Sequence, residues 1–98
     1  MFGLSEAVLK LLQDYFLTHP EIVKVYIFGS RAKGTERPGS DVDLAIITTS
    51  ERDISGAVKA DLEELPTPYL FDVIDYQRIS YPPLREHVDR VGKLLWSS

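Results

Sequence analysis

Three short runs of β-branched and aromatic residues constrain the fold of this 98-residue chain more than any other feature. Such runs are typical of strands, and turn residues or helical patterns separate each run from the next. We expect strands at 22–28, 42–48 and 69–74. The segments around them then predict an α/β (α+β) fold, in which a small mixed sheet has helices packed on it.

Apolar residues recur at helical spacing in three of the segments around these strands. The middle segment connects the second and third strands, and a connection of this length allows the two strands to run parallel. The last segment predicts a helix at the end of the chain, after a loop at 77–83 that contains two prolines. The predicted helices cover residues 5–17, 53–65 and 84–96, and a further short helix follows Gly29-Ser30.

Length and composition narrow the class of protein. A chain of this length makes one domain, 1–98, and it has no apolar run of the ~20 residues needed to span a membrane. It has no cysteine, which excludes disulfides and cysteine-ligated metals and is consistent with a cytoplasmic location. The net charge of −4, from 11 Lys and Arg against 15 Asp and Glu, makes nucleic acid an unfavourable partner.

Gly29-Ser30 follows the first strand directly and precedes the short helix. Glycine lets the backbone approach an anion closely, and the free amides at the start of a helix point toward it. Arg31 and Lys33 add positive charge in the same turn. This arrangement predicts a phosphate-binding turn, and the alternative is an ordinary turn with solvated charges.

Two of the predicted strands carry acidic residues. Asp41 and Asp43 alternate with Val42, so both carboxylates lie on one face, and Asp72 interrupts the third strand. Carboxylates this close repel each other, and a hard divalent cation such as Mg²⁺ offsets the repulsion. Three carboxylates from neighbouring strands are able to hold two such ions, although Asp41 and Asp43 alone also fit a solvated loop. Asp75 is a competitor for the role of Asp72, but it lies on the opposite face, and the preferred prediction is that it is solvated or caps a turn.

Together these motifs resemble the nucleotidyltransferase superfamily that includes DNA polymerase beta. Within it, the chain resembles the minimal nucleotidyltransferase family. The shared pattern is Gly-Ser, ten residues, Asp-x-Asp and a later strand with a third Asp, which covers residues 29–44 and 71–75 here. The resemblance runs through most of the chain and implies the polymerase beta-like nucleotidyltransferase fold.

The resemblance also implies a chemistry. Family members transfer a nucleoside monophosphate from an NTP to a hydroxyl with the help of two Mg²⁺ ions, and we expect AMP from ATP here. Asp72 is implied to act on the acceptor hydroxyl, as a metal ligand or as a general base. The implied catalytic and metal-binding residues are Asp41, Asp43 and Asp72, and the implied nucleotide-binding residues are Gly29, Ser30, Arg31 and Lys33.

Members of this family are often paired with a HEPN-domain protein in toxin–antitoxin systems. The resemblance therefore implies that this chain is an antitoxin whose acceptor is a tyrosine of a HEPN toxin. One alternative is a catalytically weak binding module that neutralises a HEPN partner stoichiometrically. Another is a transferase that acts on a small molecule or nucleic acid together with a partner subunit. The oligomeric state is left open, a homo-oligomer included.

Several other residues are expected to have structural roles. His19 and His87 lack the spacing of metal ligands and are predicted to be surface or capping residues. Four apolar residues near the C-terminus are expected to pack in the core or between helices, with partner contact as the alternative. They are Tyr81, Leu84, Leu95 and Trp96.

Overall fold

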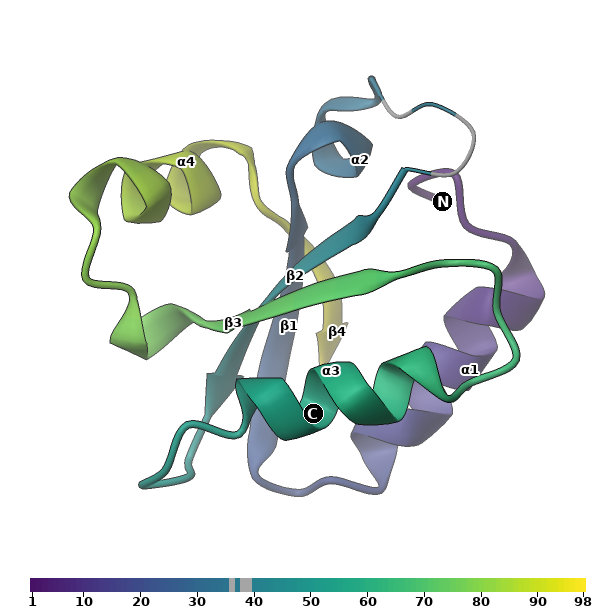
Figure 1. Ribbon diagram of the computed structural model, residues 1–98, viewed down its shortest axis with the longest axis horizontal. Helices are drawn as coiled ribbons and strands as arrows, with labels where there is room; N and C mark the ends of the chain where they lie inside the picture. The colour runs from purple at the N-terminus through teal and green to yellow at the C-terminus, as the bar shows by residue number, and fades with distance from the viewer. Residues whose placement is uncertain (36, 38–39) are drawn as a thin grey trace.

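The computed structural model describes residues 1–35, 37 and 40–98, so Glu36, Pro38 and Gly39 of the predicted site motif lie outside it. The described chain forms a four-stranded sheet in the order β3-β2-β1-β4, with helices packed on it (Figure 1). This confirms the predicted α/β class. The strands are β1 (Ile22–Phe28), β2 (Val42–Thr48), β3 (Phe71–Asp75) and β4 (Lys93–Ser97). The helices are α1 (Glu6–Leu17), α2 (Ser30–Lys33), α3 (Ser55–Glu63) and α4 (Pro82–Val91), with a 3₁₀ turn η1 (Tyr76–Arg78).

The sheet is mixed, and its topology brings the residues of the predicted motifs together at one end of the strands. β1 pairs antiparallel with β2 and β4, whereas β2 and β3 are parallel and α3 forms their crossover, as the length of the connection allows. The end of β1 therefore lies beside the start of β2, and β3 starts at the same edge. In this register Asp43 is paired with Phe28 on one side and with Asp72 on the other.

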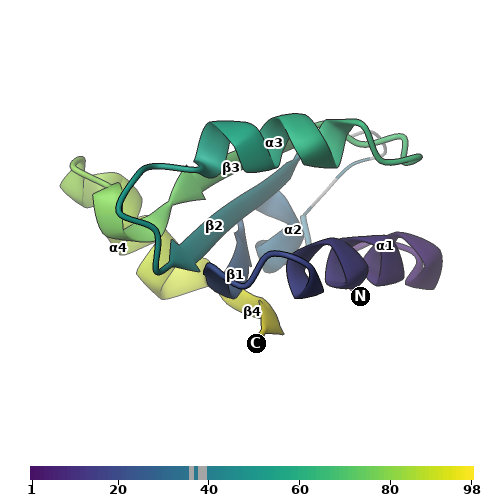
Figure 2. The ribbon, with the colours of Figure 1, turned by 90° about the horizontal axis from the view of Figure 1, so that it is seen from below.

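Two clusters of apolar side chains attach the helices to the sheet. The larger cluster lies between the sheet and helices α1 and α3, and Phe16 and Leu62 are among its buried members. The smaller cluster joins Val88 of α4 to Phe28 and Ala45. Figure 2 accordingly shows α4 on the other side of the strands from α1 and α3. The face beneath α4 carries Asp43, because Asp43 alternates with the buried residues of β2.

The C-terminal segment differs from its prediction. The helix predicted at 84–96 stops at Gly92, whose backbone is extended, and Lys93–Ser97 forms β4 instead. Trp96 packs against Phe16 with the ring centroids 5.6 Å apart. The apolar spacing of this segment suits both structures. The segment forms a strand because it pairs with the free edge of β1, and this pairing satisfies the backbone hydrogen-bonding groups of both strands.

The start of the last helix also differs from its prediction. Pro82 and Pro83, which we expected in a loop, form the first turn of α4. Proline is tolerated at this position because the first amides of a helix have no partner within it. The longest described helix, α1, has 12 residues, and no helix in the described ranges is long and apolar enough to cross a membrane.

Candidate active site

Gly29 and Asp43 are in close contact at the edge where β1 ends and β2 starts. Gly29 has φ of 74°, in the region that side chains disfavour. A Cβ atom at this position would overlap Oδ2 of Asp43. Two reasons therefore require glycine at this position. One is the backbone conformation, and the other is the space that the Asp43 carboxylate occupies. The turn predicted to bind phosphate thus lies directly against one of the predicted metal ligands.

Asp43 lies among other carboxylates. Its side chain is half-buried, and burial raises the pKa of the Asp43 carboxyl above its usual value. Repulsion from Asp72 and Asp41 raises this pKa further, and the positive charges of His87 and Arg31 lower it only in part. The negative charge of Asp43 is thus poorly compensated, as expected for a carboxylate whose natural partner is a cation.

The two predicted partners of Asp43 are more accessible. Asp41 is exposed and immediately precedes β2, and 63% of the side-chain surface of Asp72 is exposed. Val42 and Leu44 are buried on the other face, which confirms the predicted alternation along β2. Asp72 lies on the face of β3 opposite to the buried Phe71. The three acids therefore approach the same edge of the sheet from two adjacent strands.

Arg31 has a different environment from the one its motif predicts. It is 4% exposed, and its two terminal nitrogens donate to the carbonyl oxygens of Phe2 (3.0 Å) and Ser40 (2.8 Å). Its guanidinium also lies 4.8 Å from the ring centroid of Tyr69. Arg31 therefore fastens the segment that leads into Asp41, and a phosphate contact by Arg31 stays a prediction.

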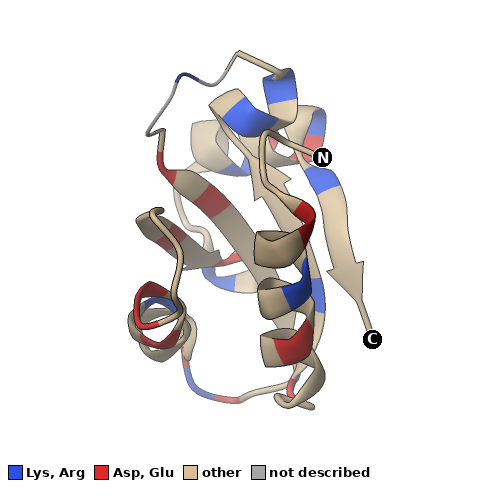
Figure 3. Cartoon of the chain, turned by 90° about the vertical axis from the view of Figure 1, so that its right-hand side faces the viewer, with Lys and Arg blue, Asp and Glu red and all other residues tan. Residues whose placement is uncertain are grey.

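Ser30 and Lys33 mark the two ends of α2. Ser30 is half-buried as the first residue of this helix, and Lys33 is exposed as its last residue. In Figure 3 basic positions on α2 lie near the acidic start of β2. An anion bound between them would therefore meet charges of both signs, unless cations covered the carboxylates.

The sequence analysis did not predict that two further residues lie near these acids. His87 of α4 was predicted to be a surface or capping residue, but it is half-buried with its ring edge-on to Phe28, at a centroid distance of 6.1 Å. Lys59 of α3 places its Nζ atom 3.9 Å from Oδ1 of Asp72. Neither residue has a sequence signal, because both reach the site only through helix packing. His19, in contrast, bonds the carbonyl oxygen of Tyr15 at the end of α1, as expected for a capping residue.

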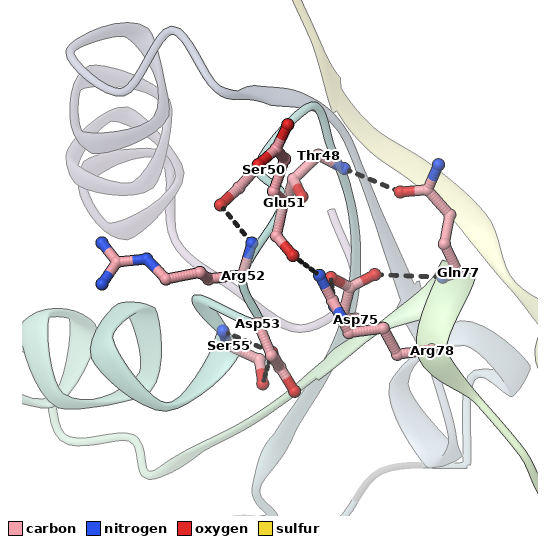
Figure 4. Close-up of polar contacts among 9 residues, drawn as sticks. All are labelled: Thr48, Ser50, Glu51, Arg52, Asp53, Ser55, Asp75, Gln77 and Arg78. Carbon is pink, nitrogen blue, oxygen red and sulfur yellow. Dashed lines mark hydrogen bonds and ion pairs between the residues drawn. The ribbon is translucent and has the colours of Figure 1, made fainter.

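The opposite end of the same two strands carries an acid of another kind (Figure 4). Asp75 is 5% exposed, and it accepts hydrogen bonds from the backbone amide of Gln77 (3.0 Å) and from Nε of Arg78 (3.1 Å). The prediction that it caps a turn is confirmed, and the alternative that it is solvated is wrong. Asp75 is already satisfied by protein groups and has no need of a cation.

The donor set at the Gly29 edge is suited to a hard divalent cation. Asp41, Asp43 and Asp72 offer carboxylate oxygens, which Mg²⁺ prefers, and their mutual repulsion favours a bound cation. Within residues 1–35, 37 and 40–98, no three acidic or histidine side chains are already close enough to form a metal site. Side-chain rotation at the two exposed acids would accompany metal binding.

Comparison with known proteins connects this geometry to a family. A family model described as polymerase beta, nucleotidyltransferase matches residues 10–98. The chain belongs to this family. The match confirms the resemblance drawn from the Gly-Ser and Asp-x-Asp motifs and the polymerase beta-like fold.

Individual members of the family are similar over most of this chain. It is 27% identical to the protein adenylyltransferase MntA of Shewanella oneidensis, over 93% of this chain and 63% of MntA, and so spans less than two thirds of that relative. A crystal structure of a toxin–antitoxin with AMP-PNP matches with a TM-score of 0.65 and 27% identity, over 97% of this chain and 75% of that chain. A protein assigned as a minimal nucleotidyltransferase matches with a TM-score of 0.67 and 27% identity, over 93% and 96%.

Proposed function

We propose that this chain is a Mg²⁺-dependent nucleotidyltransferase that moves AMP from ATP to a tyrosine hydroxyl of a HEPN-domain toxin, and so acts as its antitoxin. The observation that carries the proposal is the contact between Gly29 and Asp43, with Asp72 paired in register beside them. It combines a glycine turn at the start of a helix with clustered carboxylates, of which Asp43 is only partly compensated by positive charge. The similarity to a protein adenylyltransferase and to a toxin–antitoxin that holds AMP-PNP supports the choice of nucleotide and acceptor.

The three acids would divide the work by their positions. Asp41 and Asp43, next to the Gly29 turn, would bind the cations that accompany the triphosphate. Asp72, which lies on the adjacent strand and is more exposed than Asp43, would bind the cation nearest the acceptor and accept the proton of the acceptor hydroxyl. Bound Mg²⁺ would neutralise charge on the phosphates and lower the pKa of the acceptor hydroxyl. The phenol oxygen then bonds to the α-phosphorus of ATP, and the bond to the leaving pyrophosphate breaks.

The phosphates themselves would be held by the turn. The backbone amides of Gly29 and Ser30, with the Ser30 hydroxyl, are proposed to bind the β- and γ-phosphates, because they lie at the start of a helix, where free amides favour an anion. Lys33, exposed at the end of α2, is a further candidate for a phosphate contact. Arg31 would act mainly by holding the carbonyl oxygen of Ser40, and with it the start of the Asp-x-Asp motif.

We further propose that residues 1–98 act as a single domain in the cytoplasm. The absence of cysteine agrees with a reducing compartment, and the reaction needs ATP. A protein acceptor also fits the net charge of −4 better than a nucleic acid does.

Intact-protein mass spectrometry tests the proposal. The chain is incubated with Mg²⁺, ATP and the product of the adjacent gene, the proposed HEPN-domain partner, and both proteins are weighed. We expect the mass of AMP to appear on the partner with the wild-type chain, and not with Asp43→Asn. Asp14→Asn is the matched control, because Asp14 is an exposed acid on α1 that pairs with Lys10 within its own helix.

Two results would contradict the proposal. If no NTP yields a modified partner while the two proteins still co-purify, the chain is a stoichiometric binding module. If Asp43→Asn transfers AMP as fast as Asp14→Asn, the carboxylates at the Gly29 edge are not the active site.

A further inference from the structure

We infer that Lys59 and Glu63 of α3 form a positioning pair for Asp72, by bonding both backbone groups of the preceding residue at the open edge of the sheet. The inference rests on the proposed function, in which Asp72 binds the cation nearest the acceptor. It adds two residues from a helix outside the family motif to the machinery of the site.

The open edge is a consequence of the topology. β3 is the terminal strand of the sheet and pairs only with β2 in the described structure. In the ladder, the amide of Val42 donates to the carbonyl oxygen of Leu70. Backbone groups of alternate residues in a strand face opposite sides, so the N–H and C=O groups of Phe71 face the free edge. Unpaired groups there would be left to water or to a passing strand.

Side chains of α3 satisfy both of these groups. Oε2 of Glu63 accepts from the Phe71 amide at 3.3 Å, and Nζ of Lys59 donates to the Phe71 carbonyl oxygen. The two side chains are themselves paired at 3.1 Å. The bond from Lys59 and the bond from Phe71 both lower the pKa of Glu63. At this residue, two side chains from one turn of α3 form the backbone hydrogen bonds that a neighbouring strand would otherwise form.

The same ammonium group reaches the site. Nζ of Lys59 lies 3.9 Å from Oδ1 of Asp72, so one charge contacts Glu63, the strand backbone and the candidate catalytic acid. The Phe71 side chain is 1% exposed and anchored in the core. Phe71 is therefore held by its side chain and by both backbone groups. This fixes where the next residue projects its carboxylate toward Asp43.

Two other helical ion pairs of the same spacing lack this connection. Lys10–Asp14 on α1 and Arg90–Glu86 on α4 have both partners at least 60% exposed. Their bonds stay within their own helices in the described residues. All three pairs have the same spacing in sequence. The Lys59–Glu63 pair differs from the others because it also contacts the Phe71 backbone and Asp72.

The test removes the pair without changing the net charge. In the full chain, Lys59→Met/Glu63→Gln is compared with Lys10→Met/Asp14→Asn, and Mn²⁺ binding is followed by electron paramagnetic resonance. We expect Mn²⁺ affinity to fall about tenfold in the first double variant, the usual scale for partners of a metal ligand, and to stay within about twofold in the second. Amide hydrogen exchange should quicken at Phe71 in the first variant only.

Kinetics separate positioning from simple stability. With the HEPN-domain acceptor and ATP, the Lys59→Met/Glu63→Gln variant should lose about tenfold in kcat with little change in the KM for ATP, at a temperature where it is fully folded. The charge swap Lys59→Glu/Glu63→Lys keeps the helical ion pair but presents the wrong charge to each backbone group. We expect it to be as impaired as the double variant.

The outcomes distinguish the inference from the function it rests on. Wild-type Mn²⁺ affinity in the Lys59→Met/Glu63→Gln variant, or full activity in the charge swap, would overturn the positioning role. If Asp43→Asn also binds Mn²⁺ like the wild type, the metal site itself is wrong and the inference falls with it. Loss of binding in Asp43→Asn alone would remove the inference and leave the proposed function intact.

Discussion

The two ends of the β2–β3 pair both carry aspartates, and the structure treats them in opposite ways. Asp75, at the far end, is buried, and two nitrogen donors surround its carboxylate (Figure 4). Asp43, at the near end, is half-buried beside Asp72 and Asp41, and this surrounding raises its pKa. The first acid contributes to stability through its bonds within the protein. The second costs stability through burial and repulsion, and we propose that a bound cation removes this cost.

This difference offers a way to separate structural from functional acids in a small domain. The Arg78 side chain has a second contact besides Asp75. Its terminal nitrogen donates to the Glu51 carbonyl oxygen at 2.6 Å, and this bond stabilises the loop between β2 and α3. At the other end, Arg31 donates to the Ser40 carbonyl oxygen, and its charge offsets only part of the repulsion around Asp43. Both arginines fix loops, but only one of them bonds an acid.

The largest effect on stability is expected at the glycine that touches the functional acid. Gly29→Ala should lower the free energy of unfolding by about 3 kcal/mol, because it combines backbone strain with overlap against Asp43. Gly34→Ala is the matched control, since its φ of 75° is similar and, among the described residues other than its chain neighbours, no atom lies within 4 Å of the added Cβ. It should cost about 1 kcal/mol. Urea unfolding measures both, and equal costs would show that Asp43 does not crowd Gly29.

Neutralising the two acids should change stability in opposite directions. Asp75→Asn should lose about 2 kcal/mol, because the amide cannot accept from both Gln77 and Arg78. Asp43→Asn should leave the metal-free protein equally stable or slightly more stable, because it removes repulsion from Asp72. Thermal unfolding in the presence of a chelator makes the comparison. A marked loss of stability in Asp43→Asn would mean that Asp43 is structural too.

The smallest effect is a pH dependence. Because the pKa of Asp43 is higher in the folded protein than its unfolded value near 3.8, the folded state keeps this proton to higher pH. The contribution of Asp43 to stability is therefore most favourable at low pH and declines as pH rises through the folded pKa. The difference in free energy of unfolding between wild type and Asp43→Asn, taken across this range, should show the decline. A flat difference would contradict the raised pKa, and saturating Mg²⁺ should reverse the trend.

The acids and the turn of the site were predictable because each has a local signature. Gly29-Ser30 follows a β-branched run, and Asp41 and Asp43 have the strand period of two, so the sequence shows which faces they share. The length of the connection through 53–65 allowed a parallel crossover. Together these placed Asp72 beside Asp43, which the β2–β3 register confirms.

Other parts of the molecule were beyond local patterns. Residues 93–97 fit a helix as well as a strand, and β4 exists because β1 had a free edge to pair. Asp72 and Asp75 are both acids in one five-residue strand, and only the packing around them shows that Asp75 is buried and paired. Lys59 and His87 reach the site from helices whose docking angles no sequence pattern specifies.

The sequence by itself therefore determined the class of fold, the family and the chemical groups of the site, because strand period, turn chemistry and motif spacing act over a few residues. The tertiary structure alone decided which charges are compensated. Compensation depends on whether folding brings a positively charged or hydrogen-bonding group, near or distant in sequence, close to the carboxylate. Arg78 bonds Asp75 within one turn of chain, and Lys59 approaches Asp72 across the edge of the sheet. The acidic neighbours of Asp43 are offset only in part by His87 and Arg31.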